Sequence, residues 1–170
     1  TPFDIPESEP DANRGVTSSR IVHSIMEDSN GKMWFGTNGG LNRYNGLEFK
    51  VFRNESTDSL AISNNIVTDL LEEANGMLYV ATQNGLNLYD WKLEQFHTLS
   101  LLPDTKAQAS NQYISALCKD HEGYIWAGIT GAGVVKFKVS DYAIDTIAHL
   151  PMTKSSVPAV KVTALSIDSS

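Results

Sequence analysis

The fold is decided by the stretch from Arg20 to Phe52, which reads RIVHSIMEDSNGKMWFGTNGGLNRYNGLEFKVF. Related stretches follow it, NIVTDLLEEANGMLYVATQNGLNLYDWKLEQFHTL over residues 65–99 and QYISALCKDHEGYIWAGITGAGVVKFKVSDYAIDTI over residues 112–147. A fourth begins at Lys161 as KVTALSIDSS. Self-similarity at a period of roughly 20–50 residues indicates a repeat architecture. We therefore interpret residues 20–170 as copies of one structural unit.

Three glycines, Gly31, Gly76 and Gly123, place the copies in register at spacings of 45 and 47 residues. Around each glycine, apolar residues stand nine and six positions before it, an acidic residue three before, an aromatic residue three after and a small residue five after. These positions hold Val22, Ile25, Asp28, Trp34 and Gly36 in the first copy, Val67, Leu70, Glu73, Tyr79 and Ala81 in the second, Ile114, Leu117, Asp120, Trp126 and Gly128 in the third, and Val162, Leu165 and Asp168 in the fourth. Chance does not supply four such matches.

Each copy is typical of a small antiparallel sheet. An apolar run ends in an acidic-x-x-Gly turn such as Asp28–Gly31, where the carboxylate accepts backbone N–H groups and the glycine adopts a positive φ. Strands are expected over residues 33–37, 41–44 and 48–52. Four short strands in about 45 residues are the template of a β-propeller blade. The fold class is therefore predicted to be all-β, with about three and a half blades of a seven-bladed propeller.

Two alternatives concern the packing of a blade. The start of the second copy, around residues 62–71, also fits an amphipathic helix, but the β-forming residues 112–116 at the same place in the third copy favour a strand. The small residues of the repeat are expected where blades approach closely. The aromatic residues Trp34, Tyr79 and Trp126 are expected to fill the wedge between neighbouring blades, in preference to forming a ligand-stacking platform.

The repeat divides the chain into five segments. They are an extended N-terminal lead (1–19), repeat 1 (20–63), repeat 2 (64–111), repeat 3 (112–157) and the start of a truncated repeat 4 (158–170). The lead contains three prolines and is expected to supply an outer strand to some blade. The chain opens at Thr1 rather than at Met, so we expect a mature or excised piece of a longer protein.

Composition disfavours several classes of partner. The chain has 170 residues and carries 13 Lys and Arg against 20 Asp and Glu, for a net charge of −7. Nucleic acids and anionic membranes are bound by basic patches, so we expect neither as a partner of this fragment. No run approaches the roughly 18 apolar residues that span a bilayer. Cys118 is the single cysteine, and its apolar surroundings predict a small buried hydrophobe rather than a nucleophile.

No catalytic, metal-binding or cofactor-binding residue is predicted. The four histidines lack metal-ligand spacing, and they are His23, His97, His121 and His149. The recurring acidic residues Asp28, Glu73 and Asp120 are interpreted as turn formers, because a calcium site needs more oxygen ligands nearby. The glycine-rich residues 38–41 lack the Lys and Ser/Thr of a phosphate loop. The residues expected to line a central channel are Ser24, Asp69, Ala116 and Ala164, and they repeat no catalytic chemistry.

Residues 25–46, IMEDSNGKMWFGTNGGLNRYNG, resemble the two-component regulator propeller repeat, whose pattern is roughly I-x-E-D-x-x-G-x-L/M-W-x-G-T-x-x-G-L-x-x-Y/F. Residues 70–89 match it with Glu, Tyr and Ala in place of Asp, Trp and Gly. Residues 117–137 match less well, with Ile129 in place of Thr and an insertion at residues 131–133. In this family, such repeats build the extracytoplasmic sensor region of hybrid two-component histidine kinases of Bacteroides-type bacteria.

The resemblance implies a function that the residues alone do not show. It implies the N-terminal part of a periplasmic sensor domain, in a protein anchored in the inner membrane. That domain detects glycan-derived oligosaccharides and signals to a phosphorelay that controls transcription. The fragment itself is then no enzyme, although its parent is a sensor histidine kinase. The family offers no short ligand-binding motif, so the ligand-contacting residues are unassigned.

Two other classes of function stay open at this point. One is a propeller-type lyase or hydrolase, which needs catalytic side chains at the mouth of a central channel. The other is a purely structural interaction module. A separate expectation follows from the blade count, because three and a half blades do not close a ring of roughly four to eight. Unpaired sheet edges invite pairing with another chain, so we expect a homodimer in which two half-propellers complete one ring.

Overall fold

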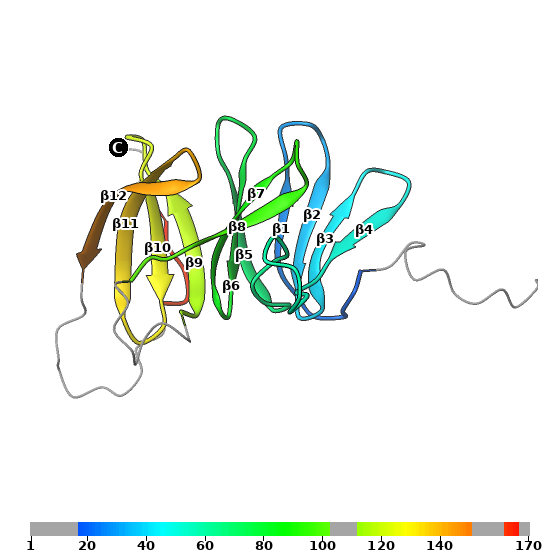
Figure 1. The fold of residues 1–170 in the computed structure, drawn as a ribbon, viewed down its shortest axis with the longest axis horizontal. Coiled ribbons are helices and arrows are strands. Elements are labelled where there is room, and N and C mark those ends of the chain that lie inside the picture. The colour runs from blue at the N-terminus through cyan, green and yellow to red at the C-terminus, as the bar shows by residue number, and fades with distance from the viewer. Residues whose placement is uncertain (1–16, 103–111, 151–161, 167–170) are drawn as a thin grey trace, which may run out of the picture.

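The computed structural model describes residues 17–102, 112–150 and 162–166. They contain twelve strands and no helix, so this part of the chain holds no helix long and apolar enough to cross a membrane. The strands form three separate four-stranded sheets, which stand side by side in Figure 1. Of the N-terminal lead, residues 1–16 lie outside the described residues, and so does the outer strand that we expected from them.

Each sheet is one blade, with antiparallel strands in chain order. The first blade comprises β1 (Val22–Glu27), β2 (Met33–Thr37), β3 (Gly40–Tyr44) and β4 (Phe49–Phe52). The second comprises β5 (Val67–Glu72), β6 (Leu78–Thr82), β7 (Gly85–Asp90) and β8 (Gln95–Leu99). The third comprises β9 (Ile114–Lys119), β10 (Ile125–Ile129), β11 (Gly133–Ser140) and β12 (Ala143–Leu150). The prediction of an all-β partial propeller is therefore confirmed.

The first strand of each blade contains an irregularity that explains the sequence pattern. In β1 the register shifts between Val22 and Ser24, and in β5 it shifts at the equivalent place, between Val67 and Asp69. An extra residue in one strand changes the face on which the following side chains lie. Apolar residues three positions apart therefore lie on one face of the strand. The strand prediction for the second copy is confirmed, and the helix alternative is wrong.

The buried side chains lie between neighbouring blades rather than within a single blade. One cluster joins Trp34 and Leu41 of the first blade to Val67, Tyr89 and Phe96 of the second. Another joins the second blade to the third, with members that include Tyr79, Leu86, Ile114, Leu117 and Phe137. The blades therefore stabilise one another through these two junctions.

Close approach of the blades at small residues is confirmed at two positions. A Cβ atom on Gly36 would lie 2.8 Å from Cγ1 of Val67, the first residue of the next blade. A Cβ atom on Gly128 would lie 2.7 Å from Cβ of Val162. Val162 of the fourth copy therefore stands on the third blade as Val67 stands on the first.

The wedge role of the aromatic residues is confirmed for two of the three. Trp34 and Tyr79 are 3% and 2% exposed, and their rings contact Tyr89 and Phe137 of the following blade, with centroids 5.3 and 6.0 Å apart. Trp126 is only half-buried. It occupies the equivalent position in the third blade, on the flank that faces away from the second blade. The only described residues beyond that flank are residues 162–166.

Cys118, predicted to be a small buried hydrophobe, is only partly buried. Cys118 pairs with Trp126 across β9 and β10 and is half-buried, because it lies on the same incompletely covered flank of the third blade. Burial nevertheless raises the pKa of the Cys118 thiol, and the nearby carboxylates of Asp120 and Asp69 raise it further. The side chain is therefore a thiol rather than a thiolate at neutral pH, as a structural cysteine is expected to be.

Candidate functional site

The turn-forming role of the acidic residues is confirmed. In the first blade, Oδ1 of Asp28 accepts hydrogen bonds from the N–H groups of Asn30 and Lys32, both at 2.9 Å. The other oxygen, Oδ2, accepts one from Nε1 of Trp34 at 2.8 Å. One carboxylate thus shapes the turn and also orients the tryptophan that fills the junction. Sequence reasoning missed this second role, although an Asp six residues before a Trp is its signal.

The third blade repeats this arrangement. Oδ1 of Asp120 accepts from the N–H groups of Glu122 and Tyr124 at 3.0 and 2.8 Å, and Oδ2 accepts from Nε1 of Trp126 at 2.8 Å. Burial alone would raise the pKa of Asp120, but these bonds and the adjacent Lys136 ammonium outweigh it and lower the pKa to about 2. Asp120 is therefore ionised at any physiological pH.

The second blade replaces this Asp–Trp pair by Glu73 and Tyr79. Glu73 accepts from the N–H of Ala74 at 2.9 Å and forms an ion pair with Lys119 of the third blade. Burial, and secondarily the Glu73 charge, raises the pKa of the Tyr79 hydroxyl. The acidic residue at this position thus links the second blade to the third instead of fixing its own aromatic residue.

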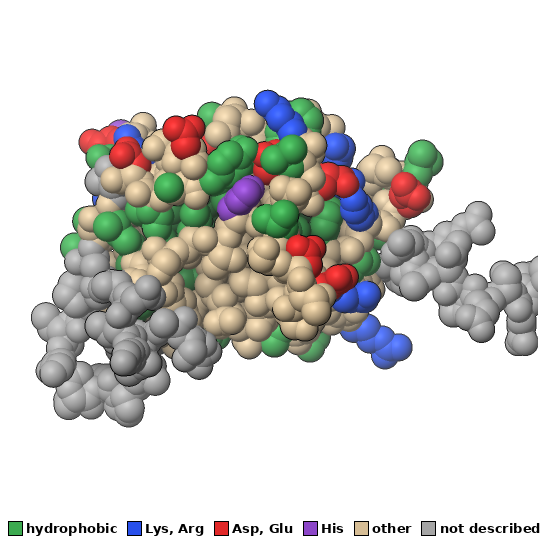
Figure 2. Space-filling model, in the orientation of Figure 1, with side chains coloured by type: hydrophobic (Ala, Val, Ile, Leu, Met, Phe, Trp, Pro, Cys, Tyr) green, Lys and Arg blue, Asp and Glu red, His purple; other side chains and the backbone are tan. Residues whose placement is uncertain are grey.

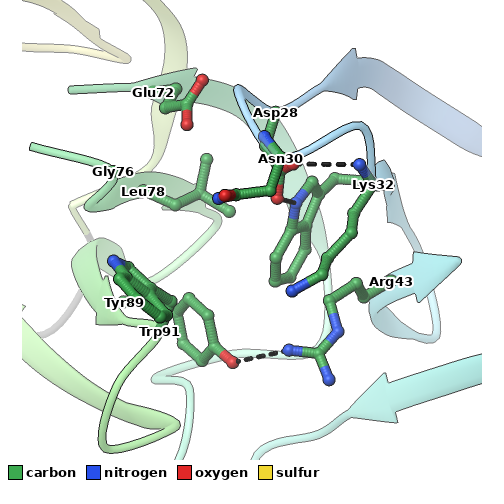
Figure 3. A pocket seen from close by; sticks show the side chains of 10 residues that line it. Asp28, Asn30, Lys32, Arg43, Glu72, Gly76, Leu78, Tyr89 and Trp91 are labelled. Carbon is green, nitrogen blue, oxygen red and sulfur yellow. Dashed lines mark hydrogen bonds between the residues drawn. The ribbon is translucent and has the colours of Figure 1, made fainter. Parts of the chain in front are cut away.

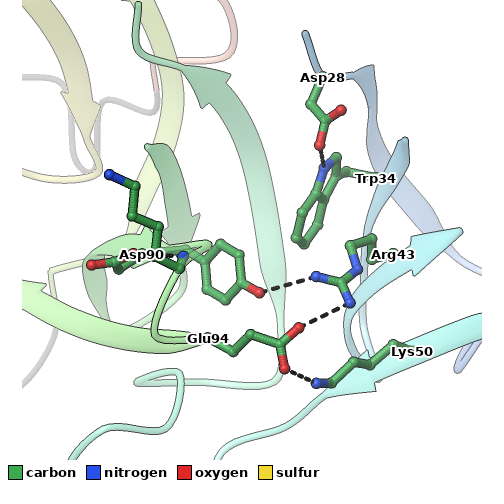
Figure 4. Close-up of polar contacts among 8 residues, drawn as sticks. Asp28, Trp34, Arg43, Lys50, Asp90 and Glu94 are labelled. Carbon is green, nitrogen blue, oxygen red and sulfur yellow. Dashed lines mark hydrogen bonds and ion pairs between the residues drawn. The ribbon is translucent and has the colours of Figure 1, made fainter. Parts of the chain in front are cut away.

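Between the first and second blades, a cation sits among aromatic rings (Figure 4). The Arg43 guanidinium lies 5.7 Å from the ring centroids of both Trp34 and Phe52. Its Nη1 donates to the Tyr89 hydroxyl at 3.3 Å and its Nη2 pairs with Glu94 at 3.0 Å. A desolvated cation over aromatic faces is favourable. Arg43 therefore ties the two blades together.

The same network controls two ionisable groups of the second blade. The bond from Lys50 is the main cause that lowers the pKa of Glu94, and Arg43 adds to it against the opposing effect of burial. Burial raises the pKa of the Tyr89 hydroxyl to about 12, although the Arg43 charge opposes this rise. Glu94 therefore stays charged and the Tyr89 hydroxyl stays neutral at physiological pH, and both accept a hydrogen bond from Arg43.

The first groove, between the first and second blades, is almost filled (Figure 3). Its cavity is only about 10 Å³. Its walls include Trp34, Arg43, Glu72 and Trp91, and Glu72 is engaged because its carboxylate accepts from the N–H and the hydroxyl of Ser29. This groove is a joint between blades and has no room for a ligand.

The second groove, between the second and third blades, has the same place in the repeat and is hollow. Its cavity is about 210 Å³. Tyr79, Leu88 and Val139 stand where the first groove has Trp34, Arg43 and Trp91, so smaller side chains leave the space open. The walls are Glu73, Asn75, Met77, Tyr79, Leu88, Val139, Ser140, Asp141 and Tyr142.

Tyr142 is the exposed aromatic wall of the second groove. It lies at the tip of the β11–β12 hairpin, where Asp141 and Tyr142 both have a positive φ, of 48° and 63°. The Tyr142 hydroxyl donates to Asp90, and the ring lies 4.4 Å from that of His97. Burial alone would raise the pKa of Asp90, but the bond from Tyr142 and those from two backbone N–H groups lower it. These contacts hold a strained hairpin tip against the second blade.

Asp69, predicted to line the channel, lies in the second blade and accepts hydrogen bonds from groups of all three blades. Its Oδ1 accepts from the Ser24 hydroxyl of the first blade at 3.1 Å and from the N–H of Leu70 at 2.9 Å. Its Oδ2 accepts from the N–H of Leu117 in the third blade at 2.7 Å. Both carboxylate oxygens therefore serve the structure. The other two channel candidates differ, since Ala116 is buried and Ala164 is exposed.

A buried polar network that sequence reasoning missed recurs in the first two blades. Its members are Ser18, Thr37 and Asn42 in the first blade, and Ser63, Thr82 and Asn87 in the second. In each, the asparagine side chain bonds the backbone N–H and the hydroxyl of the serine that precedes the blade. The third blade has buried Ile129 and Val135 at the threonine and asparagine positions. The signal in the sequence is the Ser–Thr–Asn spacing, which two copies share.

The described histidines take no part in a metal site. Nε2 of His23 bonds Oδ1 of Asn38 at 2.6 Å, and His121 is exposed in its turn, whereas the side chain of His149 lies outside the described set. Across residues 17–102, 112–150 and 162–166, no group of three or more His, Cys, Asp or Glu side chains is placed to hold a metal ion. On the face in Figure 2, basic side chains are interspersed with acidic ones.

Comparison with known proteins identifies the repeat. The model of the family "two component regulator propeller" matches residues 15–39 and 108–131. Histidine kinase P4 of Formosa agariphila is 41% identical over 49 residues, which are 29% of this chain and 4% of that protein. The chain therefore spans a small part of the length of this relative.

Two solved structures are similar in fold. The extracellular domain of the putative hybrid two component system BT3049 from B. thetaiotaomicron superposes with a TM-score of 0.67 at 22% identity, over 87% of this chain and 21% of that one. Virginiamycin B lyase from Staphylococcus aureus superposes with a TM-score of 0.59 at 14% identity, over 82% of this chain and 45% of that one. At such identities the likeness concerns the fold alone.

The two family matches fall on the first and third copies. We expected the second copy to match better than the third, and the structure gives a reason for the difference. The first and third copies keep the Asp–Trp bond and the glycine five residues after the register glycine, whereas the second has Glu73, Tyr79 and Ala81. Residues 15–39 and 108–131 therefore match the two-component regulator propeller repeat, and the described residues of the chain form a partial β-propeller.

Proposed function

We propose that this chain is part of the extracytoplasmic sensor domain of a hybrid two-component histidine kinase, and that it detects oligosaccharides released from glycans. The observation that carries the proposal is the repeat, matched by its family model in two copies. The relatives with similar sequence and fold support it, because one is a histidine kinase and another is an extracellular domain of a hybrid system. The signal would pass to a phosphorelay that controls transcription.

The second groove is the ligand site that we propose. Small-molecule pockets hold roughly 300–1,000 Å³, so a cavity of about 210 Å³ suits a ligand part no larger than one ring. A pyranose has apolar C–H faces and polar hydroxyls around its edge. The apolar floor of Met77, Leu88 and Val139 suits such a face, and Asn75 and Ser140 offer hydrogen bonds to the edge.

Charge selects among saccharides at this site. Glu73 is paired with Lys119, but Asp141 adds a negative charge at the rim, in a chain with a net charge of −7. Like charges across an interface are unfavourable. The proposed ligand is therefore a neutral sugar residue rather than a uronate or a sulfated sugar.

The mechanism that we propose is a population shift. The walls of the second groove belong to two blades, so a ligand in it contacts both. A ligand shifts an equilibrium between two arrangements only by its difference in affinity for them. A sugar that bridges the second and third blades favours the arrangement in which their walls are correctly spaced, and this bias is the signal passed on to the rest of the sensor.

The enzyme alternative lacks an observation in its favour. Its central carboxylate would be Asp69, and both oxygens of that carboxylate already accept hydrogen bonds from the protein. A general base must reach the proton that it abstracts. The likeness to a lyase is one of fold at 14% identity.

Calorimetric titration of the chain with a panel of neutral and acidic oligosaccharides tests the proposal. We expect a neutral member to bind, and Tyr142→Ala to weaken that binding about tenfold or more, because the aromatic wall is lost. Trp91→Ala is the matched control, since it removes an exposed aromatic residue from the filled groove. Binding heat from acidic members alone, or from no member, contradicts the proposal. A loss of binding in Trp91→Ala but not in Tyr142→Ala contradicts it as well, because the ligand then lies in the first groove.

A further inference from the structure

The chain contains five Asn–Gly pairs, the dipeptide in which asparagine most readily loses its side-chain amide. In that reaction the backbone nitrogen of the glycine attacks Cγ of the asparagine, and glycine favours the attack because it has no Cβ to hinder it. The pairs begin at Asn30, Asn38, Asn45, Asn75 and Asn84, and all of them lie among the described residues. The attacking nitrogen must be free to move, so the hydrogen bonds of the five glycines decide which pair can react.

Four of the five glycine N–H groups are held by a hydrogen bond. The acceptor is a backbone carbonyl for three of them and a buried threonine hydroxyl for the fourth. The bonds run from Gly31 to Asp28 at 2.9 Å, from Gly76 to Glu73 at 2.8 Å, from Gly85 to Gln112 at 2.8 Å and from Gly39 to Thr37 at 3.0 Å. Each of these nitrogens would have to break its bond before it could attack, so the fold protects these four pairs.

The pair Asn45–Gly46, between β3 and β4, differs from the other four. Both residues are exposed. The N–H of Gly46 donates no hydrogen bond to any residue that the structure describes, and a Cβ atom on Gly46 would meet nothing within 4 Å. Oδ1 of Asn45 instead accepts hydrogen bonds from the N–H groups of Leu47 and Glu48, each at 3.0 Å. The nucleophile is thus free, while the carbonyl that it attacks is held in place.

The two N–H groups on Oδ1 also favour the chemistry. Negative charge develops on this oxygen when the Gly46 nitrogen adds to Cγ of Asn45, and N–H donors already aimed at such an oxygen stabilise that charge. Oδ1 of Asn75 has only one such donor, the N–H of Met77 at 2.9 Å. Among the five pairs, Asn45 alone combines two N–H donors on Oδ1 with an unbonded glycine N–H.

The turn that carries this pair belongs to a part of the blade that stays open to water. The equivalent turn of the second blade, between β7 and β8, lies beside the first blade, since Glu94 pairs with Arg43. Trp91 and Leu93 in that turn are nevertheless 43% and 60% exposed. A blade on that side therefore leaves such a turn accessible, and the proposal does not require that side of the first blade to be uncovered.

We propose that Asn45 is a site of deamidation and isoaspartate formation in the folded chain. The Gly46 nitrogen gives its proton to a base in solution and bonds to Cγ of Asn45. The bond from Cγ to the amide nitrogen then breaks, and the amide takes up a proton and leaves as ammonia. The succinimide that remains adds one water molecule, and its opening at one carbonyl or the other gives aspartate or isoaspartate at position 45. Either product adds a negative charge to the turn, and isoaspartate also lengthens the backbone by a methylene group.

Peptide mass spectrometry of the chain, aged in mildly alkaline buffer, tests the site. Trypsin cleaves after Arg43 and Lys50, so peptide 44–50 reports on this pair alone, and peptides 21–32, 33–43 and 54–92 report on the others. We expect Asn45 to lose its amide about tenfold or more faster than any other pair. We also expect an isoaspartate methyltransferase to label the aged chain in peptide 44–50. Equal rates at all five pairs, or a faster loss at another pair, overturn the proposal.

Two controls separate the effect of the fold from that of the neighbouring residues. In concentrated urea every glycine N–H is free, so the five rates should become similar, and a lead of Asn45 that persists there overturns the proposal. Asn45→Gln should abolish the labelling, because the longer side chain closes the corresponding ring much more slowly. Asn84→Gln is the matched variant, since Asn84 is also exposed but the N–H of Gly85 is held, and its labelling should equal that of the parent chain. Labelling that survives Asn45→Gln, or that falls only in Asn84→Gln, overturns the assignment.

Discussion

The first and second junctions are built at the same positions of the repeat with different side chains. The first is closed by Trp34 under the Arg43 guanidinium, and its groove keeps a cavity of about 10 Å³. At the second, Tyr79 and Leu88 occupy those positions, and the groove keeps about 210 Å³. At this place in the repeat, two or three side chains therefore decide whether the junction is filled or keeps a cavity. The first junction keeps its space elsewhere, in a cavity of about 170 Å³ whose lining includes Phe52 and Phe96.

The two junctions also differ in how they are held at their outer ends. The first uses charges, since Arg43 and Lys50 both pair with Glu94. The second uses a hairpin tip, whose Tyr142 hydroxyl bonds the buried Asp90 carboxylate. Near the channel the two junctions share one residue, because Asp69 bonds to both neighbouring blades. A substitution can therefore weaken one junction alone or both junctions together.

Among the substitutions that test this comparison, Trp34→Ala is expected to lower the free energy of unfolding most. It removes a side chain that is 3% exposed, together with its ring contacts to Phe52 and Tyr89. Such truncations cost about 3–5 kcal/mol, since the lost burial is joined by a cavity. The free energy of unfolding from urea titration measures the loss. Trp126→Ala is the control, because that tryptophan has the same bond to an Asp but is half-buried, and its loss is expected to be smaller. Equal losses contradict the wedge role of Trp34.

The features of these junctions that the sequence predicted depend on local chemistry and on the period of the repeat. The carboxylates of Asp28 and Asp120 bond to groups no more than six residues away in the chain. Their positions near a glycine were therefore enough to identify them as turn formers. The wedge position of Trp34 and Tyr79 followed from its recurrence at one place in every copy. Such features depend on the repeat frame alone and are therefore visible without a structure.

What sequence did not predict depends on how one blade sits on another. Arg43 meets a glutamate 51 residues away, and Asp69 meets a backbone N–H 48 residues away, in pairings that no motif records. The hollow of the second groove arises from three separate substitutions, each unremarkable alone. The candidate ligand site is therefore a property of the junction and not of any one copy.

Asp69→Asn is the next largest expected effect, and it weakens both junctions together. An amide keeps one acceptor oxygen, but its NH₂ group then faces either the Leu117 N–H or the Leu70 N–H, both of which are donors. An unsatisfied buried donor costs about 1–3 kcal/mol, so we expect a loss of that size in urea titration. Ser24→Ala is the control, since it removes only the bond of the first blade to Oδ1, and about 0.5–1.5 kcal/mol is expected. A larger loss of stability in the control would mean that Asp69 stabilises the first junction only.

Tyr142→Phe is the smallest change and sharpens the comparison at the second junction alone. It removes the hydroxyl bond to Asp90 and keeps the ring against His97. In the folded chain, the pKa of Asp90 is lowered from 3.8, so the stability from its bonds is present above about pH 4 and is lost as the pH falls. The bond to Asp90 raises the pKa of Tyr142 from 10.0, so that contribution is present below about pH 10 and is lost as the pH rises.

The stability difference between the parent chain and Tyr142→Phe should therefore be largest between about pH 5 and pH 9, and should shrink at both ends. Thermal unfolding midpoints of both proteins across the pH range measure it. Tyr44→Phe is the matched control, since the Tyr44 hydroxyl donates to the backbone carbonyl of Gly46 within the first blade, and its difference should not narrow in acid. A Tyr142→Phe difference that stays constant down to pH 3 would mean that the hydroxyl does not act through Asp90. The hairpin tip would then be held by the ring contact with His97, and the second junction would lack the polar latch that distinguishes it from the first.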